Sequence, residues 1–187
     1  MENICFILAP CGLFLLIPVV WYIMVYNRFV RLRQHLRDSW AGIDVELKRR
    51  YDLIPNLVAT VKGYAKHEQE VFKQVTEART RALASVGAPG EQARDERELV
   101  SGLGKLMAVA EAYPDLKADG QFKALQDELV NTEDRLAAAR RFYNGNVRTL
   151  NTMRESFPTN IVASLASIKA EEFFEVEESV RSTVPKV

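Results

Sequence analysis

Few residues of this sequence have the types and spacing that catalysis or metal binding requires. The two histidines, His35 and His67, form neither a Glu-x-x-His nor a His-x-x-x-His pair, the spacings that place metal ligands on one helix face. Cys5 and Cys11 lie in an apolar segment, and a spacing of six residues turns them to different sides of a helix. Because no serine–histidine pair, reactive cysteine or phosphate-binding loop is found either, we expect no catalytic residues, no cofactor and no metal. An enzyme with a site of unrecognised type is the remaining alternative.

The arginines and lysines suggest two different kinds of contact. Arg28, Arg31 and Arg33 directly follow an apolar segment, and we expect them to contact acidic lipid headgroups. The basic run 48–50 begins about 33 Å beyond Tyr26 along a straight helix, outside the electrostatic reach of the lipids, so ion pairing within the domain is expected there. Overall the chain has 25 basic and 25 acidic residues, which argues against a nucleic-acid partner.

The most unusual local cluster combines two arginines with two aromatic residues at 140–144. Arg140, Arg141, Phe142 and Asn144 are a candidate patch for a protein partner, because arginine and aromatic side chains are common in recognition surfaces. The competing interpretation, which we favour, is a solvated helix face whose arginines pair with nearby carboxylates.

These residues follow an apolar segment at the N-terminus of the sequence. Residues 4–26 carry no charge, and as a helix they would extend about 34 Å, enough to cross the hydrocarbon core of a bilayer. Trp21, Tyr22 and Tyr26 lie at one end, where aromatic rings favour the lipid–water interface. A cleaved signal peptide would need a basic start, and a lipoprotein site would not have proline before its cysteine. The sequence therefore predicts a single-pass transmembrane anchor over residues 1–26, with the C-terminal domain on the cytoplasmic side because the basic residues follow the span.

A long helical pattern continues from the anchor over residues 27–83. Its apolar positions recur every 3.6 to 3.7 residues, as one face of a helix requires. Pro55 falls inside the pattern without changing its phase, which predicts one continuous helix kinked at Pro55 rather than two helices. Glu68 interrupts the stripe and is expected at its solvent edge.

Shorter helices are predicted over residues 91–112 and 121–156, after a loop at 85–90. A fourth helix, capped by Thr159 or Asn160, is expected to end near residue 173. No β-alternation is found, so the predicted fold is all-α, an antiparallel bundle of about four helices over residues 27–174. Residues 175–187 read as an acidic, disordered tail.

Several motifs of this chain closely resemble the LemA family. They are NRFVRLR (27–33), IDVELKRRYDLIPNLV (43–58), VKGYAKHE (61–68), AEAYPDLKA (110–118), AARRFYN (138–144) and SFPTN (156–160). The resemblance implies a bacterial inner-membrane protein with one N-terminal span and an antiparallel helical bundle, and some relatives are linked to bacterial membrane organelles. It implies no reaction and no catalytic residues.

The sequence thus favours a membrane-anchored structural or scaffold protein without enzymatic activity. Its first helix is longer than the others can cover, so self-association into a homo-oligomer is expected to bury the remaining apolar surface. The alternative is an adaptor whose bundle face near residues 140–144 binds another membrane protein.

Overall fold

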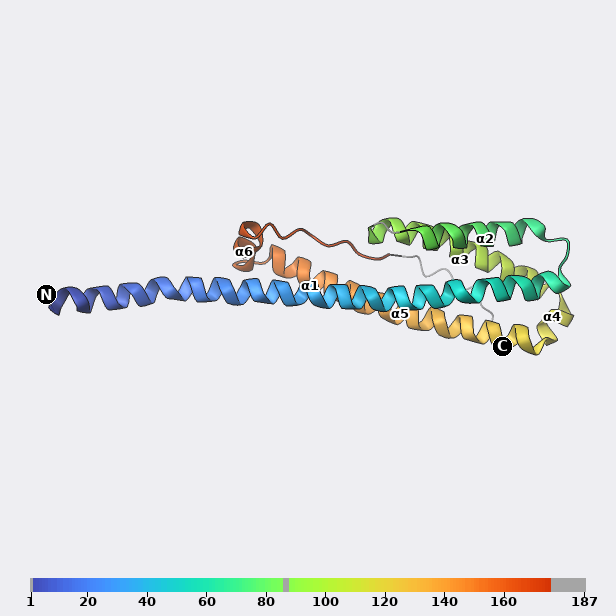
Figure 1. Ribbon diagram of the computed structural model, residues 1–187, viewed down its shortest axis with the longest axis horizontal. Coiled ribbons are helices and arrows are strands. Elements are labelled where there is room, and N and C mark those ends of the chain that lie inside the picture. The colour runs from blue at the N-terminus through green and yellow to red at the C-terminus, as the bar shows by residue number, and fades with distance from the viewer. Residues whose placement is uncertain (1, 86–87, 176–187) are drawn as a thin grey trace. The chain divides into compact units, whose positions relative to one another are not determined.

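The computed structural model describes residues 2–85 and 88–175, with the backbone alone for residues 2–15. It contains, in chain order, α1 (Glu2–Tyr64), α2 (Gln69–Ala84), α3 (Pro89–Glu111), α4 (Pro114–Ala118), α5 (Gly120–Glu155) and α6 (Thr159–Leu165) (Figure 1). Since no strand occurs among the described residues, the predicted all-α class is confirmed.

The chain forms two compact units. The first consists of Met1–Asp38 and Gly145–Glu171, and the second of Ser39–Asn144 and Glu172–Val187. Two of the three boundaries fall inside long helices, so α1 and α5 each contribute one part to each unit. The predicted division of the chain into an anchor (1–26), a helical bundle (27–174) and a tail (175–187) remains a prediction.

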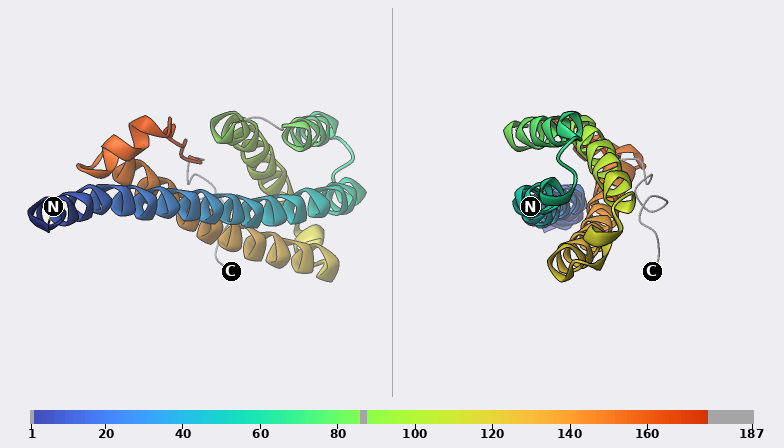
Figure 2. Two further views of the ribbon diagram at one scale, coloured as in Figure 1. Left: turned by 60° about the vertical axis from the view of Figure 1, so that its left-hand side comes forward. Right: turned by 90° about the vertical axis from the view of Figure 1, so that its right-hand side faces the viewer.

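In the second unit, the C-terminal part of α1 is followed by α2, α3 and the N-terminal part of α5. Successive long helices reverse direction, as Figures 1 and 2 show, because short connections force neighbouring helices to run antiparallel. Their buried faces are built from apolar side chains spaced by three and four residues: Ile43, Leu47, Ile54, Leu57, Val75, Leu99, Leu103, Leu106, Leu129 and Leu136. The antiparallel order agrees with the prediction, but the four helices are not the predicted ones. α2 was predicted as part of the first helix, and the predicted fourth helix, α6, belongs to the first unit.

The first unit has its own small core. Val25 and Phe29 of α1 form one cluster with Leu150 and Met153 of α5 and with four residues of α6 and its flank: Val162, Ala163, Ala166 and Ile168. Trp21 and Tyr22 pack against the same cluster. The last part of the predicted anchor is therefore covered on one side by α5 and α6.

The first helix is continuous through Pro55, as expected, but its predicted end at residue 83 is wrong. It ends at Tyr64, and residues 65–68 form a turn before α2. The apolar stripe continues across this turn, since Val61, Ala65, Phe72 and Val75 are all buried. Both helices bury these residues in the same core, so the apolar positions keep their helical spacing across the turn. The sequence pattern therefore does not indicate that a helix ends there.

Two other predictions about the helices also need correction. Residues 114–118, expected to be a break, form the five-residue helix α4. The last helix stops at Leu165 rather than near residue 173, because Ser167 adopts a positive φ of 50° that the α-helix cannot accommodate. No side chain caps α6; the hydroxyl of Thr159 instead donates to the carbonyl of Ser156 at 3.0 Å.

Candidate functional site

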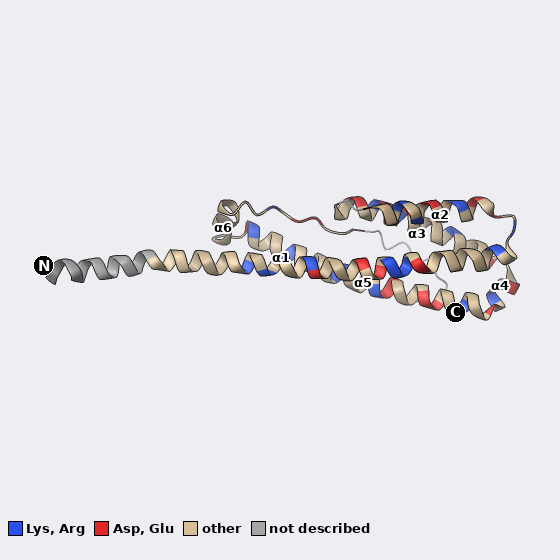
Figure 3. Cartoon of the chain, viewed as in Figure 1, with Lys and Arg blue, Asp and Glu red and all other residues tan. Residues whose placement is uncertain are grey.

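The part of α1 between Leu16 and Met24 exposes a continuous face of apolar side chains. Leu16, Ile17, Val19, Val20, Ile23 and Met24 each retain 51–63% of their surface. Successive residues of a helix point about 100° apart, so these six side chains share one face that covers about 160° of the circumference. Trp21, Tyr22 and the buried Val25 lie on the opposite side. Figure 3 shows an uncharged stretch of α1 after the part drawn in grey, and the sequence contains no charged residue between Leu16 and Asn27.

No helix in the described part of the chain is both long enough and apolar enough to cross a membrane. The predicted span over residues 4–26 is therefore not supported by the structure. The side chains of its residues 4–15 lie outside the described residues.

The predicted headgroup contacts lie just beyond this apolar stretch. Arg28 and Arg31 are exposed and Arg33 is half-buried. None of the three forms an ion pair with a described carboxylate, whereas Arg49, further along α1, pairs with Glu128 of α5.

The strongest electrostatic feature of the second unit is a buried network around Arg50. The guanidinium is 1% exposed and donates to Glu96 of α3, which is fully buried, and to Glu133 of α5 at 2.8 Å. The hydroxyl of Tyr51 also donates to Glu96, and burial raises the pKa of this phenol above its ordinary value of 10.0. Ion pairing of the basic run, expected from the sequence, is thus confirmed for Arg49 and Arg50.

This network connects three helices but is closed to substrate. Glu96 has no exposed surface, its charge is balanced by Arg50, and its other oxygen accepts a hydrogen bond from Tyr51. A carboxylate in that position cannot reach an external proton donor or acceptor, so the arrangement suits fixing helix register rather than acid–base chemistry. Glu96 was missed from the sequence, although its place three residues before Leu99 on the apolar stripe of α3 was a signal.

Pro55 is accommodated by a contact from a neighbouring helix. Proline has no N–H, so the carbonyl of Tyr51 lacks its usual partner one turn later. The guanidinium Nε of Arg79 in α2 donates to this carbonyl at 2.7 Å. The position predicted as a kink is therefore a point where α2 is tied to α1.

The candidate partner patch at residues 140–144 has two different environments. Arg141 is exposed and Phe142 keeps 64% of its surface. Asn144 instead binds the chain itself, accepting from the N–H of Phe174 at 2.9 Å and donating to its carbonyl at 3.1 Å. Arg140 is half-buried and interacts with other groups. The exposed part of this patch is thus Arg141 and Phe142.

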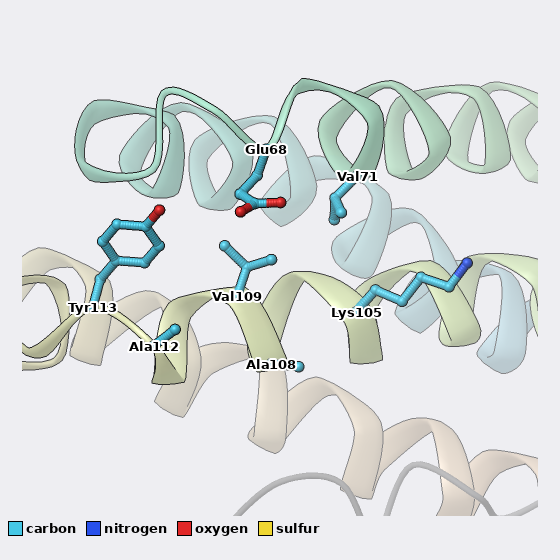
Figure 4. Close-up of a pocket in the computed structure, with 7 residues that line it drawn as sticks. All are labelled: Glu68, Val71, Lys105, Ala108, Val109, Ala112 and Tyr113. Carbon is cyan, nitrogen blue, oxygen red and sulfur yellow. The ribbon is translucent and has the colours of Figure 1, made fainter.

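A shallow groove lies between α2 and α3. Glu68 lies above Val109, with Tyr113 and Lys105 on its two sides, as Figure 4 shows. These groups include no nucleophile paired with a base, and the rest of the lining is alanine and valine. Within the described residues, no group of three or more potential metal ligands occurs, and both histidines are exposed.

Comparison with known proteins gives a consistent family match. The model of the LemA family matches residues 39–187. Magnetosome protein MamQ 2 of Paramagnetospirillum magneticum is 28% identical over 82% of this chain and 65% of its own length. Magnetosome protein MamQ of Magnetospirillum gryphiswaldense is 26% identical, over 89% of this chain and 71% of its own. Protein LemA of Metamycoplasma hominis is 24% identical, over 92% and 80%. The match to MamQ 2 thus spans slightly less than two thirds of that relative.

Proposed function

The chain belongs to the LemA family, and from this premise we propose that it is a membrane-associated, non-enzymatic scaffold anchored by the N-terminal part of α1. The names of the family and of the relatives state no enzymatic activity. In its finer form the proposal is a single-pass inner-membrane protein whose domain lies in the cytoplasm and self-associates.

One observation carries the membrane part of this proposal. One face of α1 from Leu16 to Met24 consists of apolar side chains that remain more than half exposed, and the other residues of this stretch also carry no charge. A helix that is apolar on all sides is stable only inside a protein core or in lipid, because water would have to solvate every face. In the first unit α5 and α6 cover residues from Trp21 onward on one side, which leaves the preceding turns for lipid.

Charge substitutions in the exposed turns test this anchor. We expect the double variant Ile17→Arg/Val20→Arg to leave the membrane fraction, because each arginine in the centre of a span costs about 2.5–3.5 kcal/mol on insertion scales. The matched control is Gln34→Arg, at an exposed position of the same helix. The measurement is retention in the membrane pellet after alkaline carbonate extraction. Full retention of the double variant would contradict the proposed anchor.

The arginines after the apolar stretch support a cytoplasmic domain. Arg28 and Arg31 are exposed, and positive flanks remain on the cytoplasmic side. A C-terminal fusion to a reporter that is active only outside the cytoplasm is expected to be inactive. High reporter activity would reverse the proposed orientation without affecting the anchor itself.

The adaptor function is the second candidate, and Phe142 is the observation that favours it. This ring is 64% exposed beside the exposed Arg141, a pairing typical of recognition surfaces. The same surface serves self-association equally well, so the identity of the bound protein separates the two functions.

A further inference from the structure

α6 and the residues around it present a second apolar surface in the first unit. Phe157 is 81% exposed, Leu165 71% and Ile161 49%. Ile161 and Leu165 are four residues apart and therefore share one face of α6. The other face is buried, because Val162 and Ala163 belong to the core cluster. α6 is thus apolar toward the protein, and its outward side presents Ile161 and Leu165 together with the uncharged polar residues Asn160 and Ser164.

This surface lies in an uncharged segment of the chain. Between Glu155 and Lys169 the sequence contains no Asp, Glu, Lys or Arg. Figure 3 shows α6 without charged residues, whereas the helices of the second unit carry them along their length. The exposed polar residues of this segment, Ser156, Asn160, Ser164 and Ser167, are uncharged, so the segment can enter the interfacial layer without burying a charge.

The core of the first unit connects α6 to the apolar part of α1. Trp21 and Tyr22 pack against the cluster that contains Val162 and Ala163. The ring of Tyr22 also stacks on that of Tyr26, with centroids 6.3 Å apart. Aromatic belts of this kind mark the level of the lipid–water interface. α6 is therefore attached to α1 at the level where an anchor in that helix would leave the membrane.

Resting on the proposed anchor, we propose that α6 is a second membrane contact, which inserts Phe157, Ile161 and Leu165 into the interfacial layer of the bilayer. The occupant of this surface is lipid, because α6 packs against α1 beside its exposed apolar turns and brings no charge to that level. Short apolar helices lying in the interface plane bury one face in the boundary between headgroups and acyl chains. Arg28 directly precedes the core residue Phe29, so under this proposal it contacts acidic lipid headgroups at the same level.

Site-specific fluorescence in lipid vesicles tests this proposal on the full-length chain. The native cysteines Cys5 and Cys11 are replaced by alanine, and a single cysteine is introduced as Phe157→Cys or Leu165→Cys. Both side chains are largely exposed, so these substitutions leave the core intact. Each protein is labelled with an environment-sensitive dye and reconstituted into vesicles of phosphatidylethanolamine and phosphatidylglycerol. Spin-labelled lipid with its nitroxide near the headgroup serves as the quencher.

Two further positions calibrate the result. Val19→Cys reports the proposed anchor, and Asn131→Cys reports an exposed position of the second unit. We expect blue-shifted emission and strong lipid quenching at positions 157, 165 and 19, and water-like emission without quenching at 131.

Several outcomes would overturn the inference. Quenching at 19 but water-like emission at 157 and 165 removes the α6 contact and leaves the anchor standing. Blue-shifted emission at 165 that spin-labelled lipid does not quench shows that protein, such as a second copy of the chain, covers α6 instead. Absence of quenching at all four positions rejects the anchor and the α6 contact together, and equal quenching at 131 and 165 shows no preference for α6.

Discussion

Arg50 places a positive charge inside the second unit, where it is held by two carboxylates from different helices. Glu96 of α3 and Glu133 of α5 both accept from it, and its own position is on α1. Nε of Arg50 makes no hydrogen bond with a described group. The network is thus incompletely satisfied, and an apolar core of similar volume can be as stable. Its specific effect is to allow only the alignment of α1, α3 and α5 in which the charges meet.

Removing one partner of this network is expected to be strongly destabilising. Glu96→Ala leaves Arg50 buried with less compensation, and breaking a buried ion pair in this way costs about 3–5 kcal/mol in the free energy of unfolding. The control is Glu98→Ala, whose pair with Arg81 is more than half exposed and is expected to contribute at most about 1 kcal/mol. Urea unfolding of the full-length protein in detergent, followed by circular dichroism, measures both. Equal losses for the two variants would contradict a structural role for the buried network.

Asp119 provides a pH-dependent contact at the start of α5. Its carboxylate accepts from the N–H of Phe122 at 2.9 Å and from the hydroxyl of Tyr64 at 2.8 Å. The hydrogen bond from Phe122 first, and then that from Tyr64, lowers the pKa of Asp119 below its ordinary value of 3.8. Because the folded pKa is the lower one, this contribution to stability is complete above the unfolded pKa and is lost as pH falls through the folded pKa.

The matched variant for this contact is Asp119→Asn. We expect it to lower the melting temperature at neutral pH, since an amide accepts these hydrogen bonds more weakly than a carboxylate. The difference from the native chain should shrink as pH falls below 4. Asp115→Asn, which removes a carboxylate from the neighbouring helix α4, is the control. A difference in melting temperature that stays constant down to pH 2 would contradict the assigned contact.

At the scale of elements, α1 shows what the sequence could predict and what it could not. The periodic stripe correctly indicated one helix through Pro55, and the bounds of α3 and α5 lie within two residues of those predicted. The turn at residues 65–68 was missed because its flanking helices keep the same apolar phase. Partners such as Glu96 could not be assigned, because they depend on which helices face each other and not on local pattern. The hydrogen bond from Arg79 to Tyr51 was hidden for the same reason.

That hydrogen bond makes a testable link between α1 and α2. Arg79→Met leaves the carbonyl of Tyr51 without a donor, and an unsatisfied group of this kind costs about 1–3 kcal/mol. In a Pro55→Ala background the new N–H can satisfy that carbonyl, so the same Arg79→Met change should cost clearly less. Pro55 is exposed, so its replacement removes little packing. Comparing the four proteins by urea unfolding gives the coupling directly, and additive effects would show that Arg79 does not replace the missing helical bond.

At the scale of the whole molecule, two exposed apolar side chains of the second unit bear on which protein this chain binds. Val45 of α1 is 65% exposed and Phe142 of α5 is 64% exposed, although both side chains are large and apolar. An exposed aromatic ring beside an arginine, as at Phe142, is typical of recognition surfaces, and the proposed membrane anchor would raise the local concentration of identical chains. Self-association therefore needs only modest affinity per contact, which favours a scaffold over an adaptor with one tight partner.

A photo-crosslinking residue placed at Phe142 in the membrane-bound protein decides between these functions. We expect the main product to be a crosslink to a second copy, recognised when two differently tagged forms are expressed together. Asn131, exposed on the same helix, is the control position and should give little product. A product at Phe142 that joins the chain to a different membrane protein, and never to itself, would favour the adaptor. Sizing in detergent supplies the independent check, because a scaffold built on this surface should elute above the monomer and lose that excess when Phe142→Ser removes the ring.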